Sequence, residues 1–336
     1  MNDEDRGPVF PRRLKRSAGS GVGPSEFRWR AGGKEKGLEL AEAVSNYLAI
    51  SKEKAADLID FGSVYVHGRM ERDPSMRLSG GEEIFAAFPS YGTRRFYEID
   101  PSRVIFRDRF LLAYDKEAGI PSQQVPFDAY NNVFAALLRF LSAEKTGGRY
   151  AALHHRLDME TSGVLLFALD RKVNEPLGRA FRERKVKKEY LAWVEGFPEN
   201  DSWTDDSDIG KAGGKYKAVG KGEGKPARTF FTVLARQEGR SLVSAVPVTG
   251  RTHQIRIHLA RAGHPVAGDR AYGAKPDNRL YLHAWRLALK HPVSCKVLNL
   301  EAPVPAGWPA VPEIRYRGDA FCGTCAGIET KRIRKT

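Results

Sequence analysis

Cysteine is scarce in this chain, with three among 336 residues. Three cysteines cannot all pair with one another and are too few for a disulfide scaffold. We therefore expect a protein of the reducing cytoplasm. Cys322 and Cys325 form a lone CxxC near the C-terminus. A structural zinc site usually needs four ligands, and the sequence offers no second cysteine pair. We therefore interpret these two cysteines as free thiols and predict no metal site.

Long apolar runs are also missing. No run approaches the ~20 residues that cross a bilayer, and the acidic stretch Met1 to Arg6 lacks the apolar core of a secretory signal. We therefore expect no membrane partner. Acidic residues are outnumbered, 41 against 55 Lys and Arg, which gives a formal net charge of +14. This excess indicates a polyanionic partner, nucleic acid before an anionic membrane surface, with a solvated basic enzyme as the alternative.

The chain divides by composition into five segments. Residues 1–36 are rich in Arg, Lys, Gly and Pro and are predicted to be a basic, disordered arm. Residues 37–90 form a small domain, 91–102 a linker and 103–310 a large domain. Residues 311–336 are a basic C-terminal tail. The 41% hydrophobic content is enough for two domains with their own cores.

The small domain at 37–90 is predicted to hold two short helices followed by strands. Leu40, Val44 and Leu48 recur at helical spacing, and a second helix begins after Ser51. Residues 64–68 and 78–85 read as strands with adjoining turns. The unit is therefore a compact α+β module.

The large domain mixes helices and strands without regular alternation. Apolar spacing predicts helices at 133–141, 173–184 and 252–262, the last with Thr252 as its N-cap, and strands at 110–114, 189–195, 229–234 and 241–248. A Gly- and Lys-rich excursion covers 208–226. The predicted fold class is α+β, with a mixed, mostly antiparallel central sheet flanked by helices.

The most informative segment is His-His-Arg-Leu-Asp-Met-Glu-Thr-Ser-Gly at 154–163, which precedes the apolar run 164–169. A buried strand is a rigid platform, and a loop entering it can hold a reactive carboxylate in place. Asp158 is therefore the first candidate for catalysis. The alternative is an aspartate that only caps a turn.

Three further segments carry polar residues: RKVKKEY at 184–190, VTGRTHQIRIH at 248–258 and RLYLHA at 279–284. With the first, they resemble the RluA-like family of pseudouridine synthases of the ribosomal large-subunit type, over about residues 105–305. HRLDMETSG looks like that family's HRLD-x-x-TSG signature, and GRTHQIRIHL, KKEYLAWVEG and LYLHA look like the others. The domain at 37–90 resembles the S4 RNA-binding domain, although Glu53, Asp57 and Asp60 make it more acidic than that family.

The resemblance implies isomerisation of uridine to pseudouridine in structured RNA, ribosomal or transfer, without a cofactor or a metal. Asp158 would be the essential nucleophile or acid–base group, and Arg251 would pair with it. Tyr190 would stack on the flipped uracil and move a proton. Arg156 would help to open the RNA, and Leu282 would be an apolar wall against the base.

His155, Lys188 and Thr161 complete the predicted substrate-binding set. A loop uridine is the expected target, because N1 and C5 of a stacked, paired uridine cannot be reached. Candidate phosphate contacts are Lys185, Lys187, Lys188, Lys211, Lys215, Lys217, Lys221 and Lys225. A solvated loop is the alternative for the last five, and a monomer is expected.

Two other classes of protein compete with this interpretation. A zinc hydrolase would use His253 and His258 with His154 or His155, but a spacing of five places the first two poorly on one helix face. No Glu stands as in HExxH either. A non-catalytic RNA-binding protein of the same fold would need to lack one of the three candidate catalytic residues, and all three are present.

Overall fold

The computed structural model describes residues 25–89, 91–144 and 150–309, so the predicted tail at 311–336 lies outside the described residues. The chain forms two compact units: residues 1–100 with 120–149, and residues 101–119 with 150–336. Residues 120–149 were predicted within the large domain, but they group with the first unit. One reason is that Tyr130 donates a 2.5 Å hydrogen bond to the carboxylate of Asp60.

The first unit holds a four-stranded antiparallel sheet in the order β1-β4-β2-β3. Its elements are β1 (Ser25–Arg30), α1 (Leu40–Leu48), α2 (Lys52–Asp60), β2 (Val64–Val66), β3 (Arg69–Glu71), β4 (Glu83–Phe88) and α3 (Val133–Ala143). The predicted helices pack on the sheet through Leu40, Val44 and Leu58, all buried. Ser51 caps α2 by accepting a hydrogen bond from the Lys54 amide at 3.2 Å.

Strand β1 corrects the prediction that residues 1–36 are disordered. Residues 25–30 pair along their whole length with β4, and residues 33–35 form a short 3-10 turn. Trp29 is buried and stacks on Tyr47 with ring centroids 4.1 Å apart. The strand was not predicted because this Arg-rich segment with two aromatic residues shows little periodicity and pairs with residues more than fifty positions away. Residues 1–24 lie outside the described residues.

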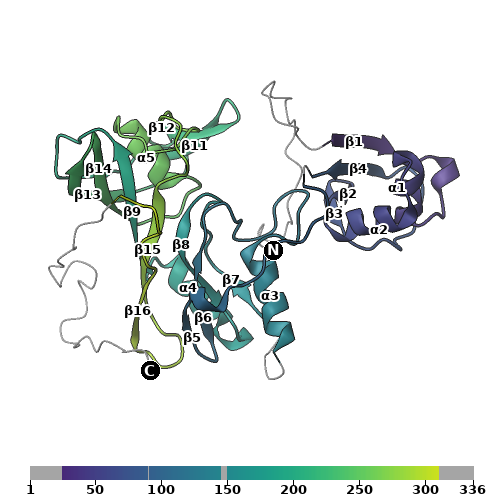
Figure 1. The fold of residues 1–336 in the computed structure, drawn as a ribbon, viewed down its shortest axis with the longest axis horizontal. Helices are drawn as coiled ribbons and strands as arrows, with labels where there is room; N and C mark the ends of the chain where they lie inside the picture. Colours follow the sequence, from purple (N-terminus) through teal and green to yellow (C-terminus); the bar gives the residue numbers. More distant parts are fainter. Residues whose placement is uncertain (1–24, 90, 145–149, 310–336) are drawn as a thin grey trace. The chain divides into compact units, whose positions relative to one another are not determined.

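The second unit is built on a ten-stranded sheet with the main order β10-β13-β14-β9-β15-β8-β6-β5, to which β16 adds beside β15 and β7 beside β8 (Figure 1). The strands are β5 (Val104–Arg107), β6 (Leu111–Lys116), β7 (Ala152–Leu153), β8 (Ser162–Ala168), β9 (Lys187–Glu195), β10 (Ser202–Asp205), β13 (Thr229–Gln237), β14 (Arg240–Pro247), β15 (Leu282–Lys290) and β16 (Val297–Glu301). All of its pairs are antiparallel except β15 with β8. This confirms the predicted mixed, mostly antiparallel sheet.

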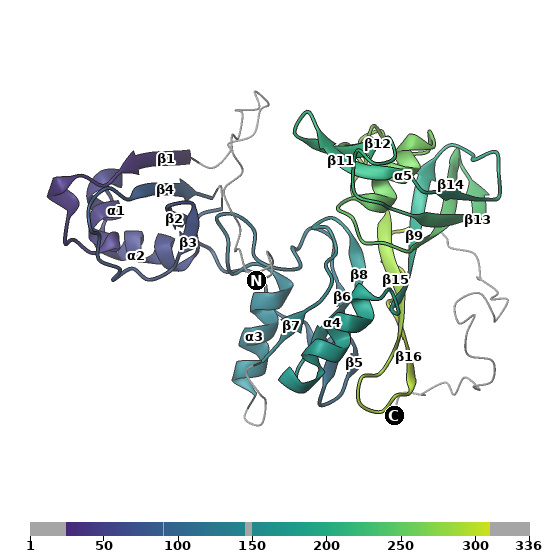
Figure 2. The same cartoon turned by 180° about the vertical axis from the view of Figure 1, so that it is seen from behind.

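Helices α4 (Asn174–Arg182) and α5 (Gln254–Arg261) accompany this sheet (Figure 2). The Gly- and Lys-rich excursion is a separate hairpin of β11 (Asp208–Ala212) and β12 (Lys215–Val219). Its turn residues Gly213 and Gly214 have φ of +62° and +79°, a region that favours glycine. None of the helices within the described ranges has the length and apolarity to span a bilayer.

The parallel contact between β8 and β15 positions the site. Ser162 at the start of β8 pairs with His283 near the start of β15, and Leu282 pairs with Ala192 of β9. Residues 162–163, 191–192 and 282–284, which are far apart in the sequence, thereby lie side by side on neighbouring strands. The sheet is the rigid platform that the sequence predicted for Asp158.

Gly163 explains why the Thr-Ser-Gly sequence follows Asp158. Its φ is +114°, and a Cβ built there would lie 2.2 Å from the carbonyl oxygen of Ala284. Glycine is therefore required where β8 passes closest to β15.

We expect Gly163→Ala to lower the free energy of unfolding by about 2–4 kcal/mol, because it combines backbone strain with a clash against backbone. Chemical denaturation followed by circular dichroism measures the loss. Gly250→Ala is the matched control, since its φ is not in the left-handed region and its nearest neighbour is the flexible Lys188 ammonium at 3.7 Å. Equal stability of the two variants would contradict the explanation.

Candidate active site

Asp158 lies in the turn between β7 and β8, and the backbone around it is tied down. The Thr161 amide donates to the Asp158 carbonyl at 3.0 Å, and the Gly119 amide donates to the Met159 carbonyl at 2.9 Å. The ammonium of Lys116, which is fully buried, donates to the same Met159 carbonyl at 2.9 Å. The Asp158 side chain itself stays 29% exposed. A fixed backbone thus presents a carboxylate that a ligand can reach.

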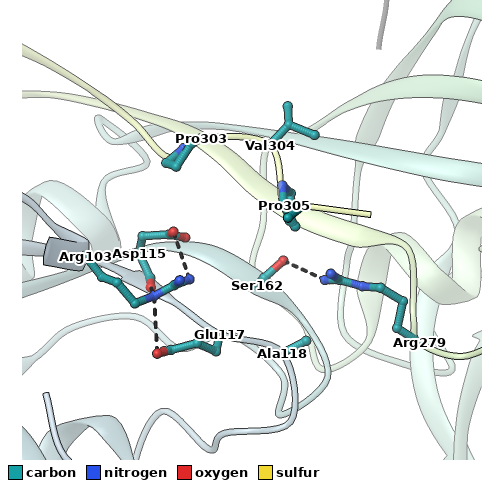
Figure 3. A pocket seen from close by; sticks show the side chains of 10 residues that line it. Arg103, Asp115, Glu117, Ala118, Ser162, Arg279, Pro303, Val304 and Pro305 are labelled. Atoms are coloured by element: carbon teal, nitrogen blue, oxygen red, sulfur yellow. Dashed lines mark hydrogen bonds and ion pairs between the residues drawn. The ribbon is translucent and has the colours of Figure 1, made fainter. Parts of the chain in front are cut away.

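A pocket of about 340 Å³ lies beside the end of β6 and the start of β8 and is lined by Arg103, Asp115, Glu117, Ser162 and Arg279 among others. Figure 3 shows Arg103 paired with Asp115 and Glu117, and Arg279 donating to the Ser162 hydroxyl. Burial lowers the pKa of Lys116 to about 7 and raises that of Asp115 to about 6. Of these side chains, Lys116 contacts the Asp158 turn directly, through the Met159 carbonyl.

Arg256 on α5 is the cation that faces Asp158. Its Nη1 lies 3.5 Å from Asp158 Oδ2, while its Nε and Nη2 form a two-pronged contact with the Asp269 carboxylate at 2.6 and 2.8 Å. The side chain of Asp269 is fully buried and that of Arg256 is 9% exposed. A bidentate contact of this kind fixes the plane of the guanidinium, so Nη1 is held toward Asp158.

This geometry corrects the prediction that Arg251 pairs with Asp158. The Arg251 Nε instead donates to the Pro226 carbonyl at 3.1 Å. The predicted N-cap at Thr252 was also wrong, because α5 begins at Gln254 with His253 in the left-handed region at φ +56°. The observed N-cap is His253, one residue later than predicted, and Arg251 precedes the helix with either N-cap. Arg256, in the first turn of the helix, takes the place beside the carboxylate.

His253 is a second group beside Asp158. Its Nε2 lies 3.9 Å from Asp158 Oδ2, and its Nδ1 shares a 2.8 Å hydrogen bond with the Tyr272 hydroxyl. Burial lowers the pKa of His253 more than the Asp158 carboxylate raises it, so the imidazole is neutral at pH 7. Tyr272 also lies under Arg256, with the guanidinium carbon 5.2 Å from the ring centroid.

Sequence reasoning missed Arg256, Asp269 and Tyr272 as site residues and weighed His253 only as a zinc ligand. Asp269 and Tyr272 lie in the turn 267–273, Ala-Gly-Asp-Arg-Ala-Tyr-Gly. The signal in the sequence was a glycine directly before an acid. The structure shows why glycine is needed there, because a Cβ at Gly268 would lie 1.9 Å from the Arg279 carbonyl oxygen. Such a tight turn is a typical place for a buried functional carboxylate, but only the contacts show its partner.

Tyr190 and Leu282 come from the adjacent strands β9 and β15. Burial, and next the Asp158 charge, raise the pKa of the Tyr190 phenol, so it keeps its proton at neutral pH. Leu282 is 3% exposed and belongs to the hydrophobic cluster against which Tyr190 packs. The Asp158 charge thus acts on the Tyr190 phenol, whereas Leu282 is mainly a core residue.

The remaining predicted residues fall into two groups. His155 and Thr161 are occupied inside the fold: His155 Nε2 accepts from the Leu166 amide at 2.9 Å, and Thr161 is 2% exposed. Burial lowers the pKa of His155 to about 3, so it is neutral, and we withdraw its predicted substrate contact. Arg156 is exposed, and burial lowers the pKa of Lys188. Arg156 therefore remains available to a polyanion, whereas Lys188 is partly buried.

The histidines of the zinc alternative do not gather. His154 bonds Asn174 at 2.8 Å, and His258 is buried against Thr229 at 3.0 Å. No group of three or more His, Cys, Asp or Glu side chains within residues 25–89, 91–144 and 150–309 could hold a metal ion.

Comparison with known proteins gives a family and several similar proteins. Residues 110–261 match the family described as RNA pseudouridylate synthase. The ribosomal large subunit pseudouridine synthase C of Pasteurella multocida is 35% identical over 219 residues, which are 60% of this chain and 64% of that protein. The match thus spans less than two thirds of that relative's length.

Two further similarities cover more of the proteins compared. The protein of the same name from Yersinia pestis is 34% identical over 293 residues, 79% of this chain and 89% of its own length. The solved structure of human RNA pseudouridylate synthase domain containing 4 is 25% identical, with a TM-score of 0.50 over 61% of this chain and 89% of that one.

Proposed function

This chain belongs to the RNA pseudouridylate synthase family, and we propose that it isomerises uridine to pseudouridine in structured RNA, with Asp158 as the essential group. One observation carries the proposal: an accessible carboxylate on a fixed turn, 3.5 Å from a guanidinium that a buried acid orients. That arrangement is what nucleophilic or acid–base work by a carboxylate needs.

The reaction rearranges bonds within one nucleotide. The bond between the ribose C1′ and N1 of the base breaks, the base turns, and a bond between C1′ and C5 forms. The proton that leaves C5 is balanced by one gained at N1, so no atom is added. Asp158 attacks or accepts a proton as a carboxylate, and the Arg256 guanidinium lies 3.5 Å from its Oδ2.

Tyr190 supplies an aromatic surface in this proposal. The Tyr190 ring offers an aromatic face on which a flipped uracil can stack, and its phenol, whose pKa is raised, stays protonated. Because His253 is neutral, it adds no positive charge beside Asp158, and Arg256 is the charged partner of the carboxylate. Base flipping makes the target accessible, and a loop uridine requires the least unstacking.

We further propose ribosomal RNA as the substrate, because relatives of this chain are named for the ribosomal large subunit. The S4-like domain at 37–90 is proposed to assist binding. Two of the acids that made it look unfavourable for RNA are paired: Arg95 contacts both Asp57 and Asp60, at 3.2 and 2.8 Å, and Arg72 contacts Asp60 at 3.0 Å. Their charges are therefore neutralised locally.

The test is to map pseudouridine by carbodiimide treatment and primer extension. Ribosomal and transfer RNA would be compared from cells with and without the gene, and from the gene-deficient RNA after incubation with purified protein. A primer-extension stop that is absent from the RNA of gene-deficient cells and appears after incubation with the purified protein supports the proposal. Identical maps from all samples would refute it.

A further inference from the structure

The segment 208–226, which we name the cationic arm, has lysines that its own acids do not neutralise. Asp208 accepts a hydrogen bond from the Gly222 amide at 2.8 Å, and Glu223 accepts one from the Gly220 amide at 3.0 Å. Lys221 pairs with Asp206 at 3.3 Å. Lys211, Lys215, Lys217 and Lys225 are exposed and have no carboxylate partner in the described part of the chain.

One side of the arm is apolar and packs on α5. Ile209, Tyr216 and Ala218 share a cluster with Ile257 of α5 and with Tyr272. Because side chains alternate along a strand, Lys215 and Lys217 lie on the opposite side of β12 from Tyr216 and Ala218. The hairpin therefore has one face fixed to the helix that carries Arg256 and a free, positively charged face. Figures 1 and 2 show β11 and β12 projecting beyond α5.

The arm also reaches the candidate active site. The Tyr216 ring lies edge-to-face with the ring of His253, with centroids 6.3 Å apart, and His253 is 3.9 Å from the Asp158 carboxylate. The Lys211 ammonium lies 5.1 Å from the Tyr216 ring centroid. At the tip, nothing lies within 4 Å of a Cβ built on Gly213 or Gly214, so another chain can approach the backbone closely.

We propose that the cationic arm binds the phosphates flanking the target uridine through Lys215, Lys217 and Lys225. The proposal rests on the proposed function, since the RNA is the substrate of that reaction. Lysines without carboxylate partners release counterions from RNA when they contact phosphates, which makes binding depend on salt rather than on base sequence. The packing on α5 holds this contact in a constant position relative to Asp158.

The test uses the full-length variant Lys215→Gln/Lys217→Gln/Lys225→Gln and an RNA fragment containing the mapped uridine. We expect KM to rise with kcat retained. We also expect the slope of log(kcat/KM) against log salt concentration to flatten by about 2, from roughly 0.7 for each lost single-strand phosphate contact. The same RNA is used at four or more salt concentrations.

The matched control is Lys172→Gln/Lys290→Gln/Lys296→Gln, which removes the same net charge from exposed positions. β8 and β15 run parallel from Ser162 and His283, and Lys172 and Lys290 lie at or beyond the far ends of these strands. This control should keep the wild-type slope, as should the arm variant with Arg in place of the three lysines.

Two results would overturn the assignment of the arm: an unchanged KM and slope in the Gln variant, or equal flattening in the control. A flattened slope in the Arg variant, which keeps every charge, would do the same. If instead the wild-type protein modifies no RNA, the proposed function fails, and that outcome is distinct because it does not depend on any arm variant.

Discussion

Asp158→Asn is expected to abolish pseudouridine formation, with kcat at least about 10³-fold below wild type. An amide has nearly the shape of the carboxylate but can neither attack carbon as an anion nor accept a proton, and positioned groups of this kind contribute about 10²–10⁴-fold on their own. Single-turnover conversion of the mapped RNA, with tritium release from C5 as the readout, measures the loss.

The fold should survive this substitution. The Asp158 side chain is 29% exposed, and the turn is closed through the Asp158 backbone carbonyl rather than through the carboxylate. Thermal melting and filter binding of the same RNA should therefore match wild type. Turnover within tenfold of wild type would remove Asp158 from the chemistry.

Arg256→Gln is expected to be the second most damaging change. The ionised Asp158 loses its charged neighbour, and the buried Asp269 loses both of its bonds to the guanidinium. Removing one partner of a buried ion pair lowers the free energy of unfolding by about 3–5 kcal/mol, so this variant should lose stability as well as activity. Both kcat and the free energy of unfolding are measured.

A second variant separates the two losses. Arg256→Gln/Asp269→Asn removes the stranded charge and should recover part of the stability, while kcat stays low because nothing charged faces Asp158. Arg251→Gln is the comparison within the same motif, since the Arg251 side chain donates to the Pro226 carbonyl rather than to Asp158 and its loss should keep kcat near wild type. An inactive Arg251→Gln beside an active Arg256→Gln would restore the original pairing prediction.

Local signals predicted the fold class and most of the elements. The apolar run 164–169 indicated β8, and the Ser51 cap placed the start of α2, because both patterns depend on neighbours in sequence. β1 was missed since its evidence lies in its pairing with β4. The left-handed conformation of His253, which caps α5, is not indicated by any local sequence pattern.

The site was predicted in part. Asp158, in the turn before β8, acts electrostatically on Tyr190 of β9, and β15 lies between these two strands in the sheet. Arg251 and His155 were assigned by their position in a motif, and their side chains point to other partners. Side-chain direction depends on helix start and packing, which a motif does not specify.

By itself, the sequence indicated Asp158 as the candidate acid, the net positive charge and the α+β class of this protein. These follow from residue chemistry and from periodicities of a few positions. Only the tertiary structure decided which cation faces Asp158, because Arg251 bonds the Pro226 carbonyl while Asp269 orients Arg256 toward the carboxylate. A buried carboxylate can orient a guanidinium only after the turn at 267–273 has folded against the helix, and that contact is not encoded in any local pattern.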